Sequence, residues 1–325
     1  MRASALPQGR SALFDLTGKK VWVAGHRGLV GSAIMRRLES EPIGEVVTAT
    51  SDELDLRRQS ATEDFVLTHR PDVIFLAAAK VGGIEANRTA QGAFLYDNLM
   101  IGANVLEAAR RAEVAKTVVL GSSCIYPRDT AQPMSEDALL TGPLEPTNEG
   151  YAIAKIATLE LGKFYRRQYG MNVISLMPTN LYGPGDNYDP MSSHVIAALI
   201  RKVHDAARSD SPSIEVWGTG RPRREFLYSD DLADAAVFLL RRYEGEAHLN
   251  VGTGKDISIR ELAELIASVG GWQGNLVFNT DMPDGTPRKL LDSSRLTEVG
   301  WSAQIGLKEG LQRCYESYSL QATRE

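Results

Sequence analysis

The run VWVAGHRGLVG, residues 21–31, decides the fold of this 325-residue chain. Its first four residues are apolar and predict a short buried strand, Val21–Ala24. Three glycines follow at regular intervals, Gly25, Gly28 and Gly31, and open a helix with an apolar side. Backbone N–H groups at the start of such a helix can approach a pyrophosphate, because glycine has no Cβ to block the anion. The run predicts a dinucleotide-binding unit, with a ligand-free glycine turn as the alternative.

Strand and helix patterns alternate beyond this unit. Strands are expected at 45–50, 73–77 and 117–121, and helices near 58–69 and 89–112. This alternation is typical of a doubly wound parallel sheet, so we predict an α/β fold.

Several positions bear on which dinucleotide the turn would bind. Asp52 follows the last glycine at about the distance where an acid binds the ribose 2′-hydroxyl. Arg27, inside the turn, could instead pair with a 2′-phosphate. Asp55 and Leu56 are candidates for contacts on the adenine side, although a plain loop acid explains Asp55 equally well.

A reactive site is predicted where residues 120–127 leave the carboxyl end of a strand, the edge at which open α/β sheets bind ligands. Ser122 could donate a hydrogen bond to a substrate oxygen there. Tyr151 and Lys155 share one helix face, and the lysine cation could lower the pKa of the phenol from about 10. The three together can protonate a substrate oxygen, whereas each alone could be a turn hydroxyl or an ordinary helical pair.

Two further residues could add acid–base chemistry. Cys124 lies two positions beyond Ser122, and its thiol could face the same pocket as a base. A lone cysteine is more often a small buried apolar residue. His194 begins an apolar-periodic helix and is either a first-turn residue or, with Cys124 opposite, a candidate acid.

Composition limits the partners. A net charge of −5 and a pI near 5.7 argue against nucleic-acid or membrane-surface binding and favour a small ligand. Cys124 and Cys314 are the only cysteines, and no metal-ligand spacing surrounds them, so we expect no disulfide framework or metal site and a reducing, cytoplasmic environment. No segment has the length and apolarity of a membrane span.

Two lobes are expected from the length and from the glycine- and proline-rich loops of the last third. The predicted dinucleotide-binding domain comprises 17–180 and 226–251, and the predicted smaller, C-terminal substrate lobe comprises 181–225 and 252–325. Residues 1–16 are expected to form a loose N-terminal extension.

Six runs carry a specific family resemblance: 24–28, 77–84, 121–127, 144–149, 151–156 and 177–185. They resemble the GDP-L-fucose synthases, a group of extended short-chain dehydrogenase/reductases built on a Rossmann sheet. The likeness implies 3,5-epimerisation of GDP-4-keto-6-deoxy-D-mannose, then reduction at C4 with NADPH. Related sugar-nucleotide 4-epimerases and 4,6-dehydratases share the serine, tyrosine and lysine, but lack the combination of Cys124 and His194.

The resemblance also implies roles for individual residues. Ser122, Tyr151 and Lys155 match the reductase set, while Cys124 and His194 match the epimerase base and acid. The implied cofactor contacts are Gly25, Arg27, Gly28, Leu29, Val30, Gly31, Asp55, Leu56, Lys155, Pro178, Thr179, Asn180, Leu181 and His194. The implied substrate contacts are Lys202, Trp217, Arg224 and Asp284, where a tryptophan can stack on a base or sugar and an arginine can bind a diphosphate.

This chain departs from relatives that carry an arginine near Ala49 and Ser51, which would be a second contact to the 2′-phosphate. We therefore expect this chain to prefer NADPH over NADH, but by a smaller factor than relatives that carry the second arginine. A homodimer is implied, with helices near 89–112 and 151–169 pairing between subunits. The alternatives are another NAD(P)-dependent sugar-nucleotide 4-epimerase or 4-ketoreductase, and a non-catalytic dinucleotide-sensing module.

Overall fold

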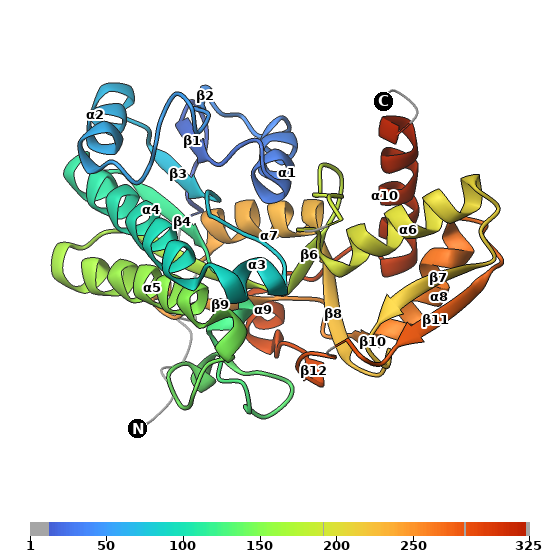
Figure 1. Ribbon diagram of the computed structural model, residues 1–325. Helices are drawn as coiled ribbons and strands as arrows, with labels where there is room; N and C mark the ends of the chain where they lie inside the picture. Colours follow the sequence, from blue (N-terminus) through green and yellow to red (C-terminus); the bar gives the residue numbers. More distant parts are fainter. Residues whose placement is uncertain (1–12, 191, 283, 323–325) are drawn as a thin grey trace.

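The computed structural model describes residues 13–322 apart from 191 and 283 (Figure 1). Its largest sheet has six parallel strands in the order β2-β1-β3-β4-β5-β9. The strands are β1 (Lys20–Ala24), β2 (Glu45–Val47), β3 (Val73–Leu76), β4 (Lys116–Leu120), β5 (Val173–Pro178) and β9 (Leu249–Val251). The predicted parallel α/β fold is confirmed. Strand order reverses between β1 and β3, which is where such sheets bind ligands beyond their carboxyl ends.

Helices cover both faces of this sheet (Figure 1). Side chains alternate along a strand, so Val21 and Val23 pack with α1 and α7 while Trp22 and Ala24 pack toward α2 and α4. The helices of the first face are α1 (Leu29–Leu38) and α7 (Ser229–Arg242), and those of the second are α2 (Gln59–His69), α4 (Gln91–Arg111) and α5 (Glu149–Tyr169).

Two regions differ from the expected pattern. The helix expected near 89–112 is found as α4, but a short helix that was not predicted, α3 (Ile84–Thr89), precedes it, and the backbone of Ala90 leaves the helical region between the two. The Gln91 side chain then bonds the Pro146 carbonyl oxygen and the Gly150 N–H at the start of α5, which fixes the beginning of α4 against its neighbour. Strand β2 is also shorter than expected and ends at Val47.

A smaller lobe lies beside the large sheet (Figure 1). Its strand β8 (Arg223–Tyr228) pairs with β10 (Asp256–Ser258), β12 (Arg288–Lys289) and β6 (Asn180–Tyr182), and β7 (Ser213–Trp217) pairs with β11 (Asn275–Asn279). Helices α6 (Val195–Arg208), α8 (Ile259–Val269) and α10 (Leu307–Ala322) pack around a second apolar core, and the short α9 (Ser294–Val299) follows β12.

The predicted loose extension, 1–16, falls partly outside the described residues, which begin at 13. For residues 13–16 the expectation does not hold. The Phe14 N–H donates to the Arg241 carbonyl oxygen, and Leu16 is 1% exposed within the main core. Phe14, which packs beside the main core, and the buried Leu16 thus anchor the chain before β1 begins.

The close packing of α4 on α5 generates a stability prediction. A Cβ on Gly102 of α4 would overlap the Thr158 side chain of α5, so Gly102→Ala should lower the free energy of unfolding by about 1–3 kcal/mol. Gly92, in the same helix, is exposed and has open space around it, so Gly92→Ala should raise stability by up to about 1 kcal/mol. Urea unfolding of both variants measures the difference, and equal effects would contradict close packing at Gly102.

Candidate active site

The glycine turn between β1 and α1 forms a cradle that tolerates no side chain at two of its positions. Gly25 has φ +87°, and a Cβ there would lie 2.7 Å from the Ala78 Cα. A Cβ on Gly31 would overlap the Gly25 carbonyl group. Gly28 caps α1 without a side chain, so the first N–H groups of the helix keep their capacity to bind an anion. The buried Nδ1 of His26 also lacks a partner among the described residues. These features fit a dinucleotide pyrophosphate.

The residues expected to select the dinucleotide differ in whether they already have an ion-pair partner in the structure. Arg27 is exposed and makes no ion pair within the described part of the chain. Asp55 is bound by Arg57, whose Nε lies 2.8 Å from its Oδ1, and hydrogen bonds from Arg57 lower the pKa of the Asp55 carboxyl. Asp52 is exposed, while Leu56 packs beside the core. Arg27 is therefore free to bind a phosphate, whereas the predicted adenine-side role of Asp55 competes with an internal ion pair.

Four of the predicted catalytic side chains converge at the end of β4. Ser122 caps the short 3-10 helix Ser123–Ile125, and its Oγ accepts the Cys124 N–H at 3.4 Å. Lys155 of α5 is buried, and its Nζ donates to the Leu120 carbonyl oxygen at 2.9 Å. The same Nζ lies 5.7 Å from the centre of the Tyr151 ring. The helical spacing of Tyr151 and Lys155 thus directs both side chains to the strand end that carries Ser122.

Burial dominates the electrostatics of this cluster. It raises the pKa of Tyr151 well above its ordinary value, while the Ser122 hydroxyl acts in the opposite direction as a hydrogen-bond partner. The lowering that we expected from Lys155 is therefore not found: the groups that act on the pKa of Tyr151 are Cys124, which raises it with burial, and Ser122, which lowers it. Burial also raises the pKa of the Cys124 thiol and lowers that of Lys155 to about 8. At neutral pH, Tyr151 holds its proton and most of Lys155 remains charged.

Sequence reasoning missed a further lysine at this cluster. The ammonium of Lys289, from β12, lowers the pKa of Cys124 against the larger effect of burial. The only sequence signal was a charged pair, Arg288-Lys289, after a glycine- and proline-containing loop, which is ordinary for an exposed edge. Lys289 approaches Cys124 through the pairing of β12 with β8, which the sequence pattern did not indicate.

His194 is placed differently from the other predicted catalytic residues. It is the N-cap residue of α6 and its side chain is exposed. His194 acts electrostatically on the carboxyl group of Asp186, whose pKa is raised by burial. The Asp186 Oδ2 has no partner among the described residues. The structure therefore does not bring His194 into the buried cluster around Cys124.

The residues expected to contact the cofactor beside the nicotinamide, 178–181, run from the end of β5 into β6. Pro178 ends β5, and the side chains of Thr179 and Asn180 donate to the Glu225 carbonyl oxygen, which joins this segment to β8. Leu181 continues into β6 and packs beside the main core.

On the smaller lobe, Trp217 is 57% exposed, and the Lys202 Nζ lies 6.0 Å from its ring centre. Asp284 accepts hydrogen bonds from the N–H and hydroxyl of Thr219 and lines a cavity of about 140 Å³ with Arg221, Pro222, Gly285 and Pro287. Arg224 of β8 is half-buried and its Nη1 donates to the Arg223 carbonyl oxygen. An open aromatic surface beside a cation can stack a nucleobase, so this lobe offers a nucleotide-binding surface.

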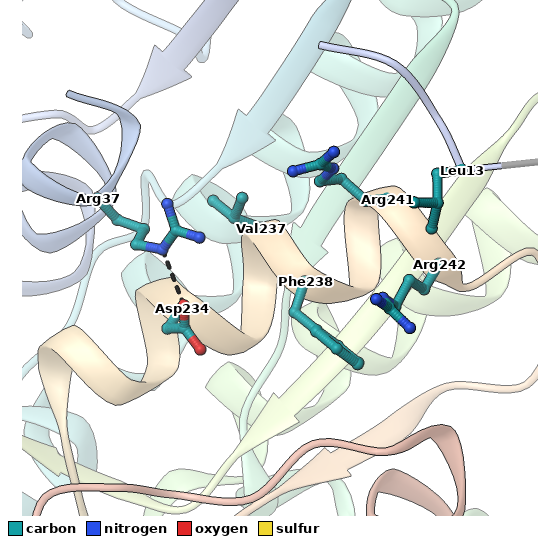
Figure 2. Close-up of a pocket in the computed structure, with 7 residues that line it drawn as sticks. All are labelled: Leu13, Arg37, Asp234, Val237, Phe238, Arg241 and Arg242. Atoms are coloured by element: carbon teal, nitrogen blue, oxygen red, sulfur yellow. Dashed lines mark hydrogen bonds and ion pairs between the residues drawn. The ribbon is translucent and has the colours of Figure 1, made fainter. Parts of the chain in front are cut away.

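A better-enclosed cavity lies elsewhere, along α7 (Figure 2). It measures about 170 Å³ and is lined by Leu13, Arg37, Asp234, Val237, Phe238, Arg241 and Arg242. Arg37 donates to Asp234 at 2.8 Å across it. The cavity is smaller than the range of about 300–1,000 Å³ typical of ligand pockets and contains none of the predicted catalytic residues. We therefore assign the active site to the end of β4.

Neither a cluster of metal-binding side chains nor a membrane-spanning helix is found among the described residues. In 13–322 without 191 and 283, no group of three or more histidine, cysteine, aspartate or glutamate side chains could hold a metal ion. Over the same residues, no helix has both the length and the apolarity needed to cross a membrane.

The chain is similar to known proteins over nearly its whole length. Residues 21–252 match the model of the NAD dependent epimerase/dehydratase family. The chain is 55% identical to a GDP-L-fucose synthase of Sinorhizobium fredii over 94% of this chain and 97% of that relative. It is 50% identical to a GDP-L-fucose synthase of Escherichia coli over 93% of this chain and 97% of that relative.

Among solved structures, a GDP-L-fucose synthetase from Naegleria fowleri bound to NADP superimposes with a TM-score of 0.91. The two sequences are 27% identical, and the match covers 99% of each chain. The chain therefore belongs to the NAD-dependent epimerase/dehydratase family, and within it to the GDP-L-fucose synthases.

Proposed function

We propose that this protein converts GDP-4-keto-6-deoxy-D-mannose to GDP-L-fucose by inversion at C3 and C5 and NADPH-dependent reduction at C4. The observation that carries the proposal is a buried thiol, Cys124, beside the Ser122 hydroxyl, the Tyr151 phenol and the Lys155 ammonium. A reductase needs the last three, whereas an additional buried thiol supports a second kind of proton transfer in the same pocket. Relatives named GDP-L-fucose synthase at 50% and 55% identity support this substrate.

The first half of the reaction depends on the C4 ketone of the sugar, which acidifies the hydrogens at C3 and C5. Cys124 removes a proton from one side, and His194 returns a proton from the other. Ser122 and Tyr151 donate hydrogen bonds to the C4 oxygen while it carries the negative charge of the enolate. His194 is exposed on α6, outside the buried cluster, so its role as the acid is supported by the resemblance to the GDP-L-fucose synthases alone.

The second half of the reaction uses the same hydrogen-bond donors. Tyr151 delivers its proton to the C4 oxygen, and burial supports this role because it keeps the phenol protonated at neutral pH. Lys155, fixed by the Leu120 carbonyl oxygen, presents its charge to the Tyr151 ring as the proton leaves. Bound NADPH supplies the hydride, while the protein supplies orientation and electrostatics.

Cofactor and substrate bind to different lobes in this proposal. Residues 17–180 and 226–251 hold NADPH through the glycine turn, Arg27 and residues 178–180, and Leu181 adds a contact from the first residue of the other lobe. Residues 181–225 and 252–325 hold the GDP part through Trp217 as a stacking surface, Lys202 and Arg224 as cations, and Asp284 as a hydrogen-bond acceptor. We also propose a cytoplasmic location, which the two buried and unpaired cysteines support.

We further propose a homodimer formed by α4 and α5. Four large apolar side chains on these two helices each expose between 37% and 58% of their surface: Tyr96, Leu99, Ile153 and Phe164. A group of large apolar side chains on adjacent helices is typical of a protein interface. A second copy of the chain, packing the same helices by two-fold symmetry, would cover them.

Two alternatives compete with this proposal. A sugar-nucleotide 4-epimerase or dehydratase would use the reductase set with a tightly held NAD, and a dinucleotide sensor would need no reactive cluster. The convergence of Ser122, Tyr151 and Lys155 argues against a sensor, and Cys124 argues against a simple 4-epimerase.

The first functional prediction concerns the cofactor. Because Arg27 is the expected contact to the 2′-phosphate, NADPH should be preferred over NADH by about tenfold or somewhat more, and Arg27→Ala should remove most of this preference. The measurement is kcat/KM for both cofactors. Arg208→Ala, which removes an exposed arginine at the end of α6, is the control and should leave the ratio unchanged. Comparable values for both cofactors in the wild type would contradict the assignment.

The second prediction tests the activity and its acid together. The wild type should oxidise NADPH when given GDP-4-keto-6-deoxy-D-mannose, as followed by loss of reduced-nicotinamide absorbance. Tyr151→Phe removes the proton donor and keeps the ring, so the rate should fall on the order of 10²- to 10⁴-fold with the fold intact. Tyr169→Phe, at the exposed end of the same helix, should retain the rate. A near-normal rate in Tyr151→Phe would assign the acid to another group.

The third prediction separates the two half-reactions. Cys124→Ser replaces the thiol by a far weaker acid, and His194→Asn removes the titrating imidazole, so both variants should lose proton exchange at C3 and C5. Exchange is followed by NMR in deuterated water with the 4-keto sugar and without cofactor turnover. Cys314→Ser, a change at a buried cysteine of the smaller core, should exchange at the wild-type rate. Wild-type exchange in both site variants would leave a plain 4-ketoreductase.

A further inference from the structure

A buried aromatic ring on α4 lies outside the apolar cores of the molecule. Phe94 is 4% exposed, yet it belongs to none of the apolar cores formed by the described residues. A buried phenylalanine ordinarily contributes its large area to such a core. The burial of Phe94 therefore comes from other neighbours, which lie at the site.

The neighbour on one side is Tyr151, the proposed proton donor. The two ring centres lie 6.4 Å apart and the ring planes meet at 80°, which is an edge-to-face arrangement. Such pairs are favourable at centre distances of about 4.5–7 Å, because the positive edge of one ring meets the negative face of the other. This contact depends on the orientation of both rings, so it restricts how the Tyr151 ring can turn.

The neighbours on the other side belong to the loop after β3. Lys80 Nζ lies over the Phe94 ring, 5.7 Å from its centre, and a Cβ on Gly82 would lie 3.2 Å from Phe94 Cζ. The same loop borders the glycine turn, where a Cβ on Gly25 would lie 2.7 Å from the Ala78 Cα. Phe94 thus lies between the proposed proton donor and a loop that borders the cofactor cradle.

Two further residues of α4 fix this loop. Asn98 Oδ1 accepts the Lys80 N–H at 2.9 Å, and Asn98 Nδ2 donates to the Lys80 carbonyl oxygen at 3.0 Å. Asp97 Oδ2 accepts a hydrogen bond from Lys80 Nζ at 2.8 Å. Positions 94, 97 and 98 share one side of the helix, because their spacing is three and four residues. One face of α4 therefore holds both the loop after β3 and the ring of Tyr151.

We propose that Phe94 is a positioning residue for the reduction at C4, which holds the Tyr151 ring in the orientation that brings its hydroxyl to the substrate oxygen. This inference rests on the proposed function for the role of Tyr151 as acid, whereas the contact between the two rings stands by itself. Phe94 carries no titrating group and acts only through Tyr151. Its loss should lower the rate of proton delivery and leave substrate binding intact.

The contact is tested without turnover, in full-length protein labelled with 3-fluorotyrosine. Fluorine NMR resolves the labelled side chains, and the Tyr151 signal is the one that disappears in Tyr151→Phe. Phe94→Leu keeps a buried apolar side chain and removes the ring, so the Tyr151 signal should shift through loss of the ring current. Leu106→Val is the matched control, because Leu106 is buried on the same helix and packs beside Gly162 of α5. It should leave the signal in place.

The role is tested by NADPH oxidation with GDP-4-keto-6-deoxy-D-mannose. In Phe94→Leu, kcat should fall about three- to tenfold while KM for the sugar nucleotide stays within about twofold. In the Tyr151→Phe background, which lacks the hydroxyl, Phe94→Leu should cause no further loss, because an effect exerted through one group is not additive with removal of that group. Leu106→Val should retain the rate in both backgrounds.

An unchanged kcat in Phe94→Leu, or the same fold loss in both backgrounds, would overturn the proposal and make Phe94 a structural residue only. An unmoved Tyr151 signal in Phe94→Leu would overturn it as well. If Tyr151→Phe itself keeps a near-normal rate, the acid of the proposed function is wrong, and a shifted Tyr151 signal in Phe94→Leu would still establish the contact. Circular dichroism of each variant checks that the fold is retained.

Discussion

The two lobes depend on one buried carboxylate, Glu225, at the centre of β8. Its side chain is fully buried and accepts the N–H groups of Thr253 at 2.6 Å, Gly254 at 2.7 Å and Leu291 at 2.9 Å. A buried carboxylate is costly unless several donors satisfy it, and burial does raise the pKa of Glu225 while these hydrogen bonds lower it. Thr253 and Gly254 follow the last strand of the large sheet, and Leu291 follows β12. Glu225 therefore fixes the segment carrying Lys289 relative to the sheet that carries Cys124.

A second buried network holds the loop after Cys124 in place. The Tyr126 hydroxyl donates to Asn250 Oδ1 on β9 and lies 3.0 Å from His248 Nε2. Asn250 is fully buried. Its backbone N–H donates to Glu136 Oε1, and its side-chain amide donates to the Met134 and Asp292 carbonyl oxygens. Burial lowers the pKa of His248 to about 4, so this ring stays neutral at physiological pH and adds no charge beside the site. Residues other than the proposed reacting groups therefore hold the loop after Cys124 in place.

The sequence predicted the sheet because its signals are local. The glycine turn after residues 21–24 and the alternation of strand and helix patterns each depend on neighbouring residues, and both are found in the structure. The predicted site residues Ser122, Cys124, Tyr151 and Lys155 also meet at one strand end. The pKa of Tyr151 moves opposite to the expectation, because desolvation comes from atoms of the whole assembled pocket. Lys289 was missed for a similar reason, since only the pairing of β12 with β8 brings it to Cys124.

These observations explain how one pocket can carry out two kinds of proton transfer. Tyr151 and Lys155 lie one turn apart on α5, so the proposed acid for the C4 oxygen and its neighbouring cation keep a fixed geometry within one helix. Cys124 lies in the short 3-10 helix that follows β4 of the large sheet, but Lys289 belongs to the smaller lobe, which also carries Trp217 and Arg224, the residues proposed to bind the nucleotide. One of the charges that lower the pKa of the Cys124 thiol therefore comes from the smaller lobe, whereas Tyr151 and Lys155 share one helix. The two joints are separate: Glu225 holds the segment after Lys289 through the Leu291 N–H, and Lys155 holds α5 on β4 through the Leu120 carbonyl oxygen.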